Sequence, residues 1–349
     1  MTVSLIGLWL LVHTLFAAAS EMGVPSQDLR SESREPLWEV DLEQNGFLAD
    51  KYSRAQSAPA DRMIAFSNPE EVVVLDQTFE KPYQSTVRAF VLDAKSGSLR
   101  KRTEWTMRTS SGVFPVRSGG YAVLQEQGTA LYGRGFEKSD LTTSPSVELV
   151  SPNGGRLAGL AMKNGHSVWI TLDPETLTES GIIPGSYQPS ISENAVAKLV
   201  LKNTGGPILE VIVGEQAPVL RQLKRGAAPP KFVSEDLLAL VVGQDFEVIS
   251  VTGAQLFTGK LKYDWHQFAS CRDGSKMAVV EQSWSELKGR VSKELIRVFD
   301  LMRKTVVWST TNEVLSVTEA SARSGVALSP DCSLVAIKSM SLVRVFRLP

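Results

Sequence analysis

Two histidines are the first residues of this sequence to consider for metal or acid–base chemistry. Beyond the first 20 residues, the chain of 349 contains only His166 and His266. A zinc site needs three or four ligands, and the sequence has neither an HExxH nor a CxxC motif to supply them locally. His166 follows Asn164 and Gly165 in a predicted hairpin turn, and His266 stands near a predicted strand start. We therefore interpret both histidines as surface or rim residues and predict no metal site.

The sequence also offers little for phosphate binding or nucleophilic catalysis. Segment 253–260 resembles a phosphate-binding loop, but it has five residues between its glycines, and Leu261 stands where a magnesium-binding Ser or Thr belongs. We interpret this segment as a strand between two turns. No GxSxG elbow is present, although the members of a catalytic triad assemble in space rather than in sequence. We predict no cofactor, and a hydrolase stays open as an alternative function.

An apolar strand, a tight turn of the Ser-Pro-Asp-Gly kind and two further strands form a pattern that recurs along the chain. It is clearest in residues 268–301 and 325–349, whose third strands read LIRVFDL (295–301) and LVRVFRL (342–348). Weaker upstream copies give seven units, spaced by about 43 residues. Four short strands in a unit of this length are typical of a β-propeller blade. The sequence therefore predicts an all-β, seven-bladed propeller.

The last unit contains only three predicted strands. The segment 36–42 (PLWEVDL) resembles the fourth strand of the preceding unit, 304–310 (KTVVWST), and Trp38 matches Trp308. Trp105 holds a similar place in the first unit. We predict that the N-terminal strand completes the last blade and closes the ring, which leaves no open strand edge at the junction.

These repeats resemble the WD40-like propellers of exported bacterial proteins, of the YVTN or quinoprotein-like kind, over residues 36–349. The Trp-Asp pair of strict WD40 repeats is absent, and Gly165-His166 is the one Gly-His pair. The resemblance implies a single rigid domain that presents loops, most often for protein binding. Some members of the wider propeller group are hydrolases or dehydrogenases.

The N-terminal segment predicts export. An apolar run over residues 5–16 leads into three alanines, which favours a signal peptide at 1–19 with cleavage after Ala19. The run is shorter than the about 20 residues of a membrane span, so we expect no stable span after cleavage; an uncleaved anchor is the alternative. Residues 20–35 are polar and predict a disordered leader. The expected location is secreted or periplasmic.

The charge balance limits the kinds of partner. The formal net charge is −1, and no basic stripe accompanies it. Nucleic acids and acidic lipid surfaces attract proteins with clustered Lys and Arg, so we exclude nucleic acid as a partner. We expect a monomer that binds a protein or a peptide.

Cys271 and Cys332 fall at the first turn of adjacent predicted blades, on the same face. A disulfide requires that their Cα atoms lie within about 7 Å. Two states stay open from the sequence: a disulfide between neighbouring blades, or two free and partly buried thiols.

Long connections gather on one predicted face of the ring. Blade six has a long segment between its second and third strands (281–294) and a long exit (311–324), and the first blade adds residues 77–84. Loops that join the second strand to the third, and blade to blade, emerge on the same face of a propeller. Long loops held by a rigid scaffold are where binding surfaces usually lie.

Trp284 is the candidate anchor of this face. Lys288, Arg290 and Lys293 flank it, and an exposed Trp beside basic residues is typical of interface hot spots. In the alternative interpretation, Trp284 packs on its own blade and the charges are solvated. The sequence predicts an exported, non-enzymatic scaffold that binds a protein or peptide through its long-loop face. The alternative is a hydrolase or lactonase with its site at the central channel.

Overall fold

The computed structural model describes ten stretches of the chain, namely residues 35–46, 62–81, 84–108, 111–184, 188–201, 206–263, 265–282, 291–315, 324–339 and 341–349. The predicted signal peptide 1–19 lies outside them, as does the predicted leader 20–35 except for its last residue. Within these stretches the elements are β-strands and short 3-10 helices such as η1 (Leu42–Asn45) and η3 (Arg134–Phe136). No helix in the described ranges is both long and apolar enough to cross a membrane.

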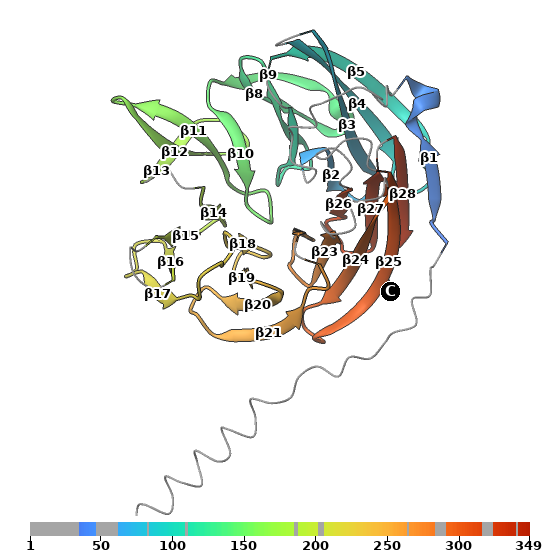
Figure 1. Ribbon diagram of the computed structural model, residues 1–349. Helices are drawn as coiled ribbons and strands as arrows, with labels where there is room; N and C mark the ends of the chain where they lie inside the picture. The colour runs from blue at the N-terminus through green and yellow to red at the C-terminus, as the bar shows by residue number, and fades with distance from the viewer. Residues whose placement is uncertain are drawn as a thin grey trace, which may run out of the picture.

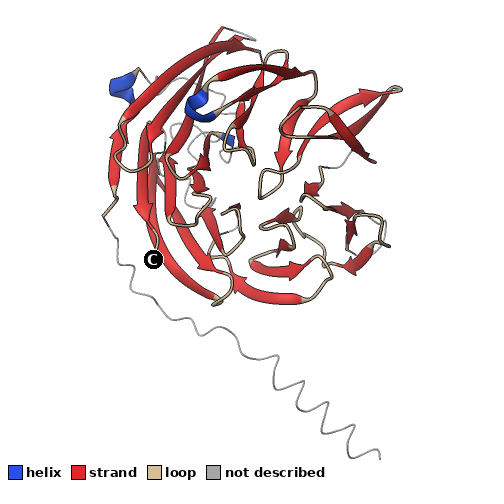
Figure 2. Ribbon diagram, turned by 180° about the vertical axis from the view of Figure 1, so that it is seen from behind, coloured by secondary structure: helices blue, strands red, loops and turns tan. Residues whose placement is uncertain are grey.

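Seven four-stranded antiparallel sheets stand around a central axis, so the predicted seven-bladed propeller is confirmed (Figures 1 and 2). Blades 1 to 3 consist, from the inner to the outer strand, of β2 (Ile64–Asn68), β3 (Glu71–Lys81), β4 (Gln84–Asp93) and β5 (Leu99–Met107); β6 (Gly112–Pro115), β7 (Tyr121–Gln125), β8 (Gly128–Tyr132) and β9 (Lys138–Thr143); and β10 (Ser146–Val150), β11 (Leu157–Lys163), β12 (His166–Leu172) and β13 (Glu179–Ile183).

Blades 4 to 6 follow the same order. They consist of β14 (Ser190–Ile191), β15 (Ala195–Val200), β16 (Ile208–Val213) and β17 (Val219–Gln222); β18 (Lys231–Phe232), β19 (Leu237–Val242), β20 (Asp245–Ser250) and β21 (Gln255–Lys260); and β22 (Trp265–Ser270), β23 (Lys276–Gln282), β24 (Val291–Asp300) and β25 (Thr305–Leu315). Blade 7 combines β26 (Gly325–Leu328), β27 (Leu334–Ser339) and β28 (Leu342–Arg347) with β1 (Trp38–Asp41).

Each blade buries both of its faces, which explains the continuous apolar runs of the strands. In β3, Val72 and Val74 pack in a cluster shared with blade 7, while Val73 and Leu75 pack in a cluster shared with blade 2. Successive side chains of a strand point to opposite faces, so a strand between two neighbours must be apolar at every position. Seven such clusters fill the seven gaps between blades.

The N-terminal strand closes the ring, as predicted. Strand β1 pairs antiparallel with β28, and the register sets Trp38 opposite Val345. The Trp38 indole nitrogen also donates a hydrogen bond of 2.8 Å to the Ala94 carbonyl of blade 1. Gly97, at φ +73°, leaves room for the ring, because a Cβ there would lie 2.7 Å from it. Trp38 therefore ties the last blade to the first.

The matched tryptophans and the glycine-rich segment also lie where the sequence places them. Trp105 and Trp308 belong to β5 and β25, the outermost strands of their blades. Segment 253–260 is a turn at Gly253 followed by β21, so it is a strand and turn rather than a phosphate loop.

We expect Trp38→Ala to lower the free energy of unfolding by about 3–5 kcal/mol, because it removes a buried aromatic side chain and leaves a cavity between the first and last blades. Chemical denaturation followed by tryptophan fluorescence or circular dichroism measures the loss. Glu39→Ala is the matched control: Glu39 is exposed on the same strand, and its change should cost less than about 1 kcal/mol. Equal stability of Trp38→Ala and wild type would mean that β1 does not hold the ring closed.

Candidate functional site

The two faces of the ring carry different connections. Strands alternate in direction, so the turns after the first and third strands of each blade lie on one face, which we call the turn face. The loops after the second strands and the connections between blades lie on the other, the long-loop face. Three of the predicted binding residues, Trp284, Lys288 and Arg290, lie outside the described residues. Lys293 lies in β24, opposite Glu313 of β25, and its side chain is not described.

Blades 1 and 6 project beyond the others on the long-loop face. Strands β3 and β25 have 11 residues each, and β4 and β24 have 10, whereas the second and third strands of blades 4 and 5 (β15, β16, β19 and β20) have six each. The long strands are seen in Figure 1. Much of segment 77–84, expected as a loop, continues the β3–β4 ladder, with Gln77 opposite Val87 and Thr78 opposite Thr86. The expectation of an irregular loop there was wrong. Strand pairing satisfies the backbone groups that a loop would expose to water.

Buried charges underlie this face between blades 7 and 1. Lys338 of β27 is 6% exposed, and Asp76 and Arg88 of blade 1 are similarly buried. Arg88 lies 3.6 Å from Asp76, and it donates a hydrogen bond of 3.0 Å to Thr78. Burial lowers the pKa of Lys338 to about 8, against the opposing attraction of Asp76. Charged groups are rarely buried without a specific role in structure or function.

A second buried polar cluster joins blades 6 and 7 below the same face. Asn312 of β25 donates hydrogen bonds to Ser324 (3.0 Å) and Ser339 (2.6 Å) and accepts one from Arg344. The Ser324 backbone nitrogen donates a hydrogen bond of 2.9 Å to Glu294, which is fully buried. The long-loop side of blades 6, 7 and 1 is thus held by polar contacts rather than by apolar packing alone.

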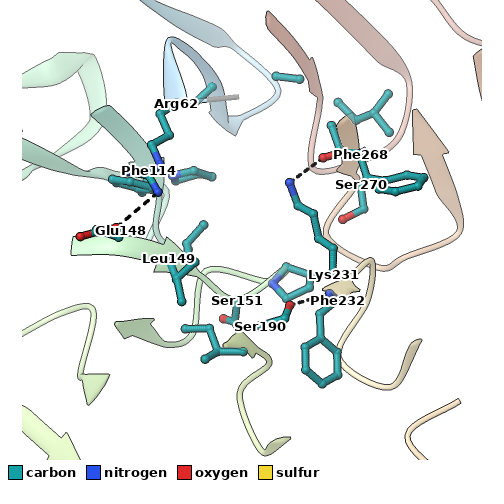
Figure 3. A pocket seen from close by; sticks show the side chains of 18 of the residues that line it. Arg62, Phe114, Glu148, Leu149, Ser151, Ser190, Lys231, Phe232, Phe268 and Ser270 are labelled. Carbon is teal, nitrogen blue, oxygen red and sulfur yellow. Dashed lines mark hydrogen bonds and ion pairs between the residues drawn. The ribbon is translucent and has the colours of Figure 1, made fainter. Parts of the chain in front are cut away.

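The inner strands of all seven blades enclose a pocket of about 330 Å³ at the centre of the ring (Figure 3). Its apolar lining includes Phe114, Leu149 and Phe232. Arg62 and Glu148 form an ion pair of 3.8 Å on one wall, and the Arg62 guanidinium lies 5.7 Å from the centre of the Phe114 ring. Across the pocket, Lys231 donates a hydrogen bond of 2.7 Å to the Phe268 carbonyl.

Two serines of the pocket, Ser151 and Ser190, bond to an amide and to the backbone. Ser151 donates a hydrogen bond of 2.9 Å to Asn153, and Ser190 accepts one of 2.8 Å from the Phe232 nitrogen. Of the two histidines, His166 is exposed at the start of β12, and the His266 ring lies 5.3 Å from that of Phe268. An apolar wall with a few cationic and acidic groups is suited to binding an extended peptide or a small ligand.

Charged residues of the inner turns meet over the turn-face end of the channel. Glu193 of blade 4 accepts hydrogen bonds from Arg117 of blade 2 and, at 2.8 Å, from Asn153 of blade 3, and both contacts lower its pKa. Glu235 of blade 5 accepts hydrogen bonds from the backbone nitrogens of Asn153 (3.0 Å) and Glu193. Burial raises the pKa of Glu235. Four consecutive blades are linked in this way.

Arg272 of blade 6 completes the network from the opposite side. Its guanidinium donates to the Ser67 carbonyl of blade 1 at 3.2 Å and to the Val116 carbonyl of blade 2 at 3.5 Å. Because blade 7 stands between blades 6 and 1, this side chain crosses the end of the channel. Burial lowers the pKa of Arg272, and the charge of Arg117 lowers it further. Arg272 partly covers the turn-face end of the channel, so we expect access to the pocket from the long-loop face.

These turn residues were not among the predicted site residues, although the repeats contain the signal. Arg117, Glu193, Glu235 and Arg272 all stand immediately after the residue that begins the inner turn. Four charges at one position of a seven-fold repeat indicate a shared location at the channel end.

Cys271 and Cys332 form a disulfide between blades 6 and 7, with their Cα atoms 5.3 Å apart. Cys271 begins the inner turn of blade 6, and Cys332 is the fourth residue of the inner turn of blade 7, which begins at Ser329, so the covalent bond lies on the turn face. The Cys271 and Cys332 side chains are almost fully buried. The disulfide and the polar cluster around Asn312 join the same two blades at opposite faces.

No model of a protein family matches the sequence, and no curated protein matches it either. Among solved structures, the uncharacterized protein lmo1340 from Listeria monocytogenes EGD-e aligns with a TM-score of 0.51 at 8% identity, over 82% of this chain and 93% of that one. TolB from Acinetobacter baumannii gives 0.40 at 10% identity, over 79% of this chain and 80% of that one. BamB from Moraxella catarrhalis gives 0.38 at 12% identity, over 89% and 97%.

Sequence identities this low are evidence of a similar fold and of nothing further. The seven-bladed propeller is assigned from the strand pairing of the chain itself, and the WD40-like resemblance is confirmed at the level of fold. The YVTN or quinoprotein-like subtype stays a prediction.

We expect Arg272→Met to lower the free energy of unfolding by about 1–3 kcal/mol, because the buried Ser67 carbonyl loses a charged donor. Urea denaturation measures this difference. Arg303→Met serves as the control, since the Arg303 side chain is 79% exposed. If both variants were as stable as wild type, the contacts of Arg272 across the channel would contribute nothing.

The lowered pKa of Lys338 predicts that the stability of the folded protein changes with pH. Its pKa of about 8 in the folded protein lies below the about 10.4 of an unfolded chain. Between these values the unfolded state binds more protons, so this group makes stability rise with pH. We therefore expect wild type to gain stability relative to Lys338→Met as the pH rises from 8 to about 10. Denaturation of both proteins across this range tests it, and a constant difference would contradict the lowered pKa.

Proposed function

We propose that this chain is an exported, non-enzymatic scaffold that binds a protein or peptide partner through the long-loop face of blades 6, 7 and 1. The observation that carries the proposal is the one-sided extension of β3, β4, β24 and β25. A blade needs no strands of 10 or 11 residues to pack against neighbours with much shorter ones. The extended ends of β3, β4, β24 and β25 instead form a surface that projects from one face of the rigid ring, which we call the platform. Binding surfaces are often built in this way on rigid scaffolds.

The buried polar groups beneath this platform support the same location. Asp76, Arg88 and Lys338 lie between blades 7 and 1, and Asn312 links blades 6 and 7. Hydrogen-bonded polar groups specify one arrangement of the strands that carry them. A surface held in one geometry loses less conformational entropy when a partner binds.

Trp284, Lys288, Arg290 and Lys293 are the proposed contact residues. The first three belong to the segment that joins β23 to β24, and Lys293 lies in β24 itself. Aromatic and Arg side chains supply most of the binding energy at protein interfaces, which favours Trp284 and Arg290 as the anchors. We expect access to the central pocket from the same face, where an acidic side chain of the partner would compete with Glu148 for Arg62 and with the Phe268 carbonyl for Lys231.

The N-terminal sequence supports export, since its apolar run and three alanines are typical of a cleaved signal peptide. An oxidising destination agrees with the bond between Cys271 and Cys332. The hydrolase alternative has less in its favour: two of the pocket serines, Ser151 and Ser190, bond to an amide and to the backbone.

Affinity capture of the full chain from its native cells, with mass spectrometry of the bound proteins, tests the proposal. We expect a reproducible partner whose capture falls by at least about tenfold in Trp284→Ala, the effect of losing a hot-spot residue. The melting temperature of the variant should equal that of wild type.

Met302→Ala is the matched control. Met302 is 83% exposed in the turn between β24 and β25, on the opposite face of the same blade, and its loss should leave capture unchanged. Unchanged capture by Trp284→Ala would place the partner elsewhere, and a large drop in its melting temperature would show that Trp284 packs on its own blade. No captured partner, together with turnover of ester or lactone substrates, would favour the hydrolase.

A further inference from the structure

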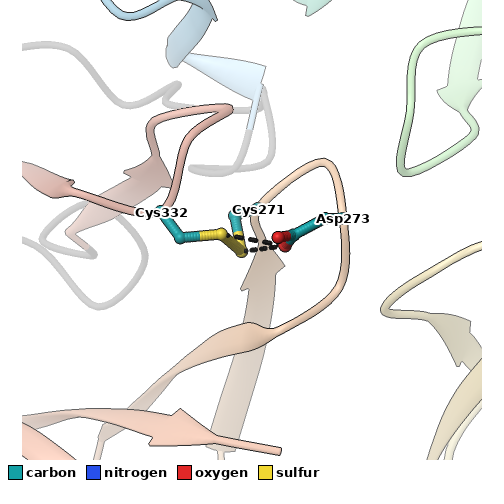
Figure 4. A group of neighbouring side chains, drawn as sticks. All are labelled: Cys271, Asp273 and Cys332. Atoms are coloured by element: carbon teal, nitrogen blue, oxygen red, sulfur yellow. Dashed lines mark hydrogen bonds between the residues drawn. A yellow bond between two sulfur atoms is a disulfide. The ribbon is translucent and has the colours of Figure 1, made fainter.

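A carboxylate lies against the disulfide between blades 6 and 7 (Figure 4). One Asp273 oxygen is 3.2 Å from the Cys271 sulfur and 3.0 Å from the Cys332 sulfur. The sulfur atoms of a disulfide carry no proton, so this oxygen gains no hydrogen bond from either of them. Three atoms with lone pairs, the two sulfurs and the Asp273 oxygen, therefore lie close together. Such convergence is what a cation needs, and the disulfide does not explain it.

We propose that Cys271, Cys332 and Asp273 form a redox-gated site for a soft, tetrahedral divalent metal such as Zn²⁺, which binds when the disulfide is reduced. A dithiol reductant supplies two electrons and two protons, which break the S–S bond and leave two thiols. The metal ion then displaces both thiol protons, and two thiolates and one carboxylate coordinate it. The disulfide and the metal are mutually exclusive states. The inference does not depend on the proposed partner binding.

The positions of the three groups suit a tetrahedral ion after a small adjustment. Zinc bonds of about 2.3 Å to sulfur and about 2.0–2.2 Å to oxygen place the two sulfurs roughly 3.8 Å apart and each sulfur roughly 3.5 Å from the oxygen. The present sulfur–oxygen distances are shorter than this by a few tenths of an ångström. Because the Cα atoms lie 5.3 Å apart, rotation of the two cysteine side chains is enough to separate the sulfurs while the blades stay in place.

Nearby donors favour the thiolate forms that a metal requires. The Lys276 backbone nitrogen lies 3.3 Å from the Cys271 sulfur, and the Ser275 hydroxyl lies 3.2 Å from the Cys332 sulfur. The Lys276 ammonium donates a hydrogen bond of 3.0 Å to the Cys332 carbonyl, which brings a positive charge close to the site. Hydrogen bonds and a nearby cation stabilise thiolates and orient metal ligands.

The site is closed to solvent on the side of the cysteines and open on the side of Asp273. Cys271 and Cys332 are 1% and 4% exposed, whereas Asp273 is exposed. Water can therefore supply the fourth ligand from the side of Asp273. Two thiolates select Zn²⁺ or Cd²⁺ over Mg²⁺ and Ca²⁺, which prefer oxygen ligands.

Titration of the reduced, oxygen-free full chain with Cd²⁺ tests the site, with the ultraviolet thiolate-to-cadmium charge-transfer band as the readout. We expect one Cd²⁺ per chain in the reduced protein and none in the oxidised protein. Asp273→Asn keeps an acceptor oxygen for the Ser275 nitrogen of its turn, and it should weaken binding by at least about tenfold. Binding to the folded state should also raise the melting temperature of the reduced protein.

Asp331→Asn is the matched control. Asp331 holds the same position in the inner turn of blade 7, where it accepts hydrogen bonds from Ser329 and Ser333, and its change should leave the cadmium affinity unaltered. Equal affinity of Asp273→Asn and wild type would overturn the proposal, because the carboxylate would not be a ligand. A reduced chain that neither binds Cd²⁺ nor is stabilised by it would overturn it as well, whether or not that chain stays folded.

Discussion

The pairing of β1 with β28 is the interaction on which the rest of the structure depends. Every blade is apolar on both faces, so it is stable only between two neighbours, and a ring of such blades must close. The closing ladder uses a strand from the N-terminal side and one from the C-terminal side of the described chain. Trp38 strengthens the junction, since it packs in the cluster shared by blades 7 and 1 and bonds to Ala94.

The disulfide, the closing strand pair and two buried polar clusters all link blades in one sector of the ring. Blade 7 receives the closing strand, the Cys271–Cys332 bond joins it to blade 6, and buried polar groups connect blades 6, 7 and 1. Between blades 3 and 4, by contrast, the apolar cluster has only five buried members, and Leu160 and Met162 of blade 3 are exposed. The surface proposed to bind a partner thus lies over a sector of the ring that a disulfide, a closing strand pair and buried polar groups hold together, which suits a surface that must keep its shape.

The two faces of the ring differ in their contacts and in the length of their connections. On the turn face, short turns bring Arg117, Glu193, Glu235 and Arg272 together, and their contacts cross the end of the channel. On the long-loop face, the connections between strands are free to lengthen without disturbing these contacts. Because Arg272 crosses the turn-face end of the central pocket, we expect access to the pocket from the long-loop face. A partner on that face therefore has both a raised rim and a central pocket within reach.

The repeat pattern by itself determined the fold, because apolar periodicity and turn chemistry are local and recur at each blade. The match of Trp38 with Trp308 even predicted the closure, since fourth strands share one environment. Contacts between blades were decided only by the tertiary structure. Whether Cys271 meets Cys332, and where the guanidinium of Arg272 reaches, depends on the spacing and tilt of the blades. That geometry arises from packing at seven interfaces between blades. No single repeat encodes it, so the contacts of these residues could be known only from the tertiary structure.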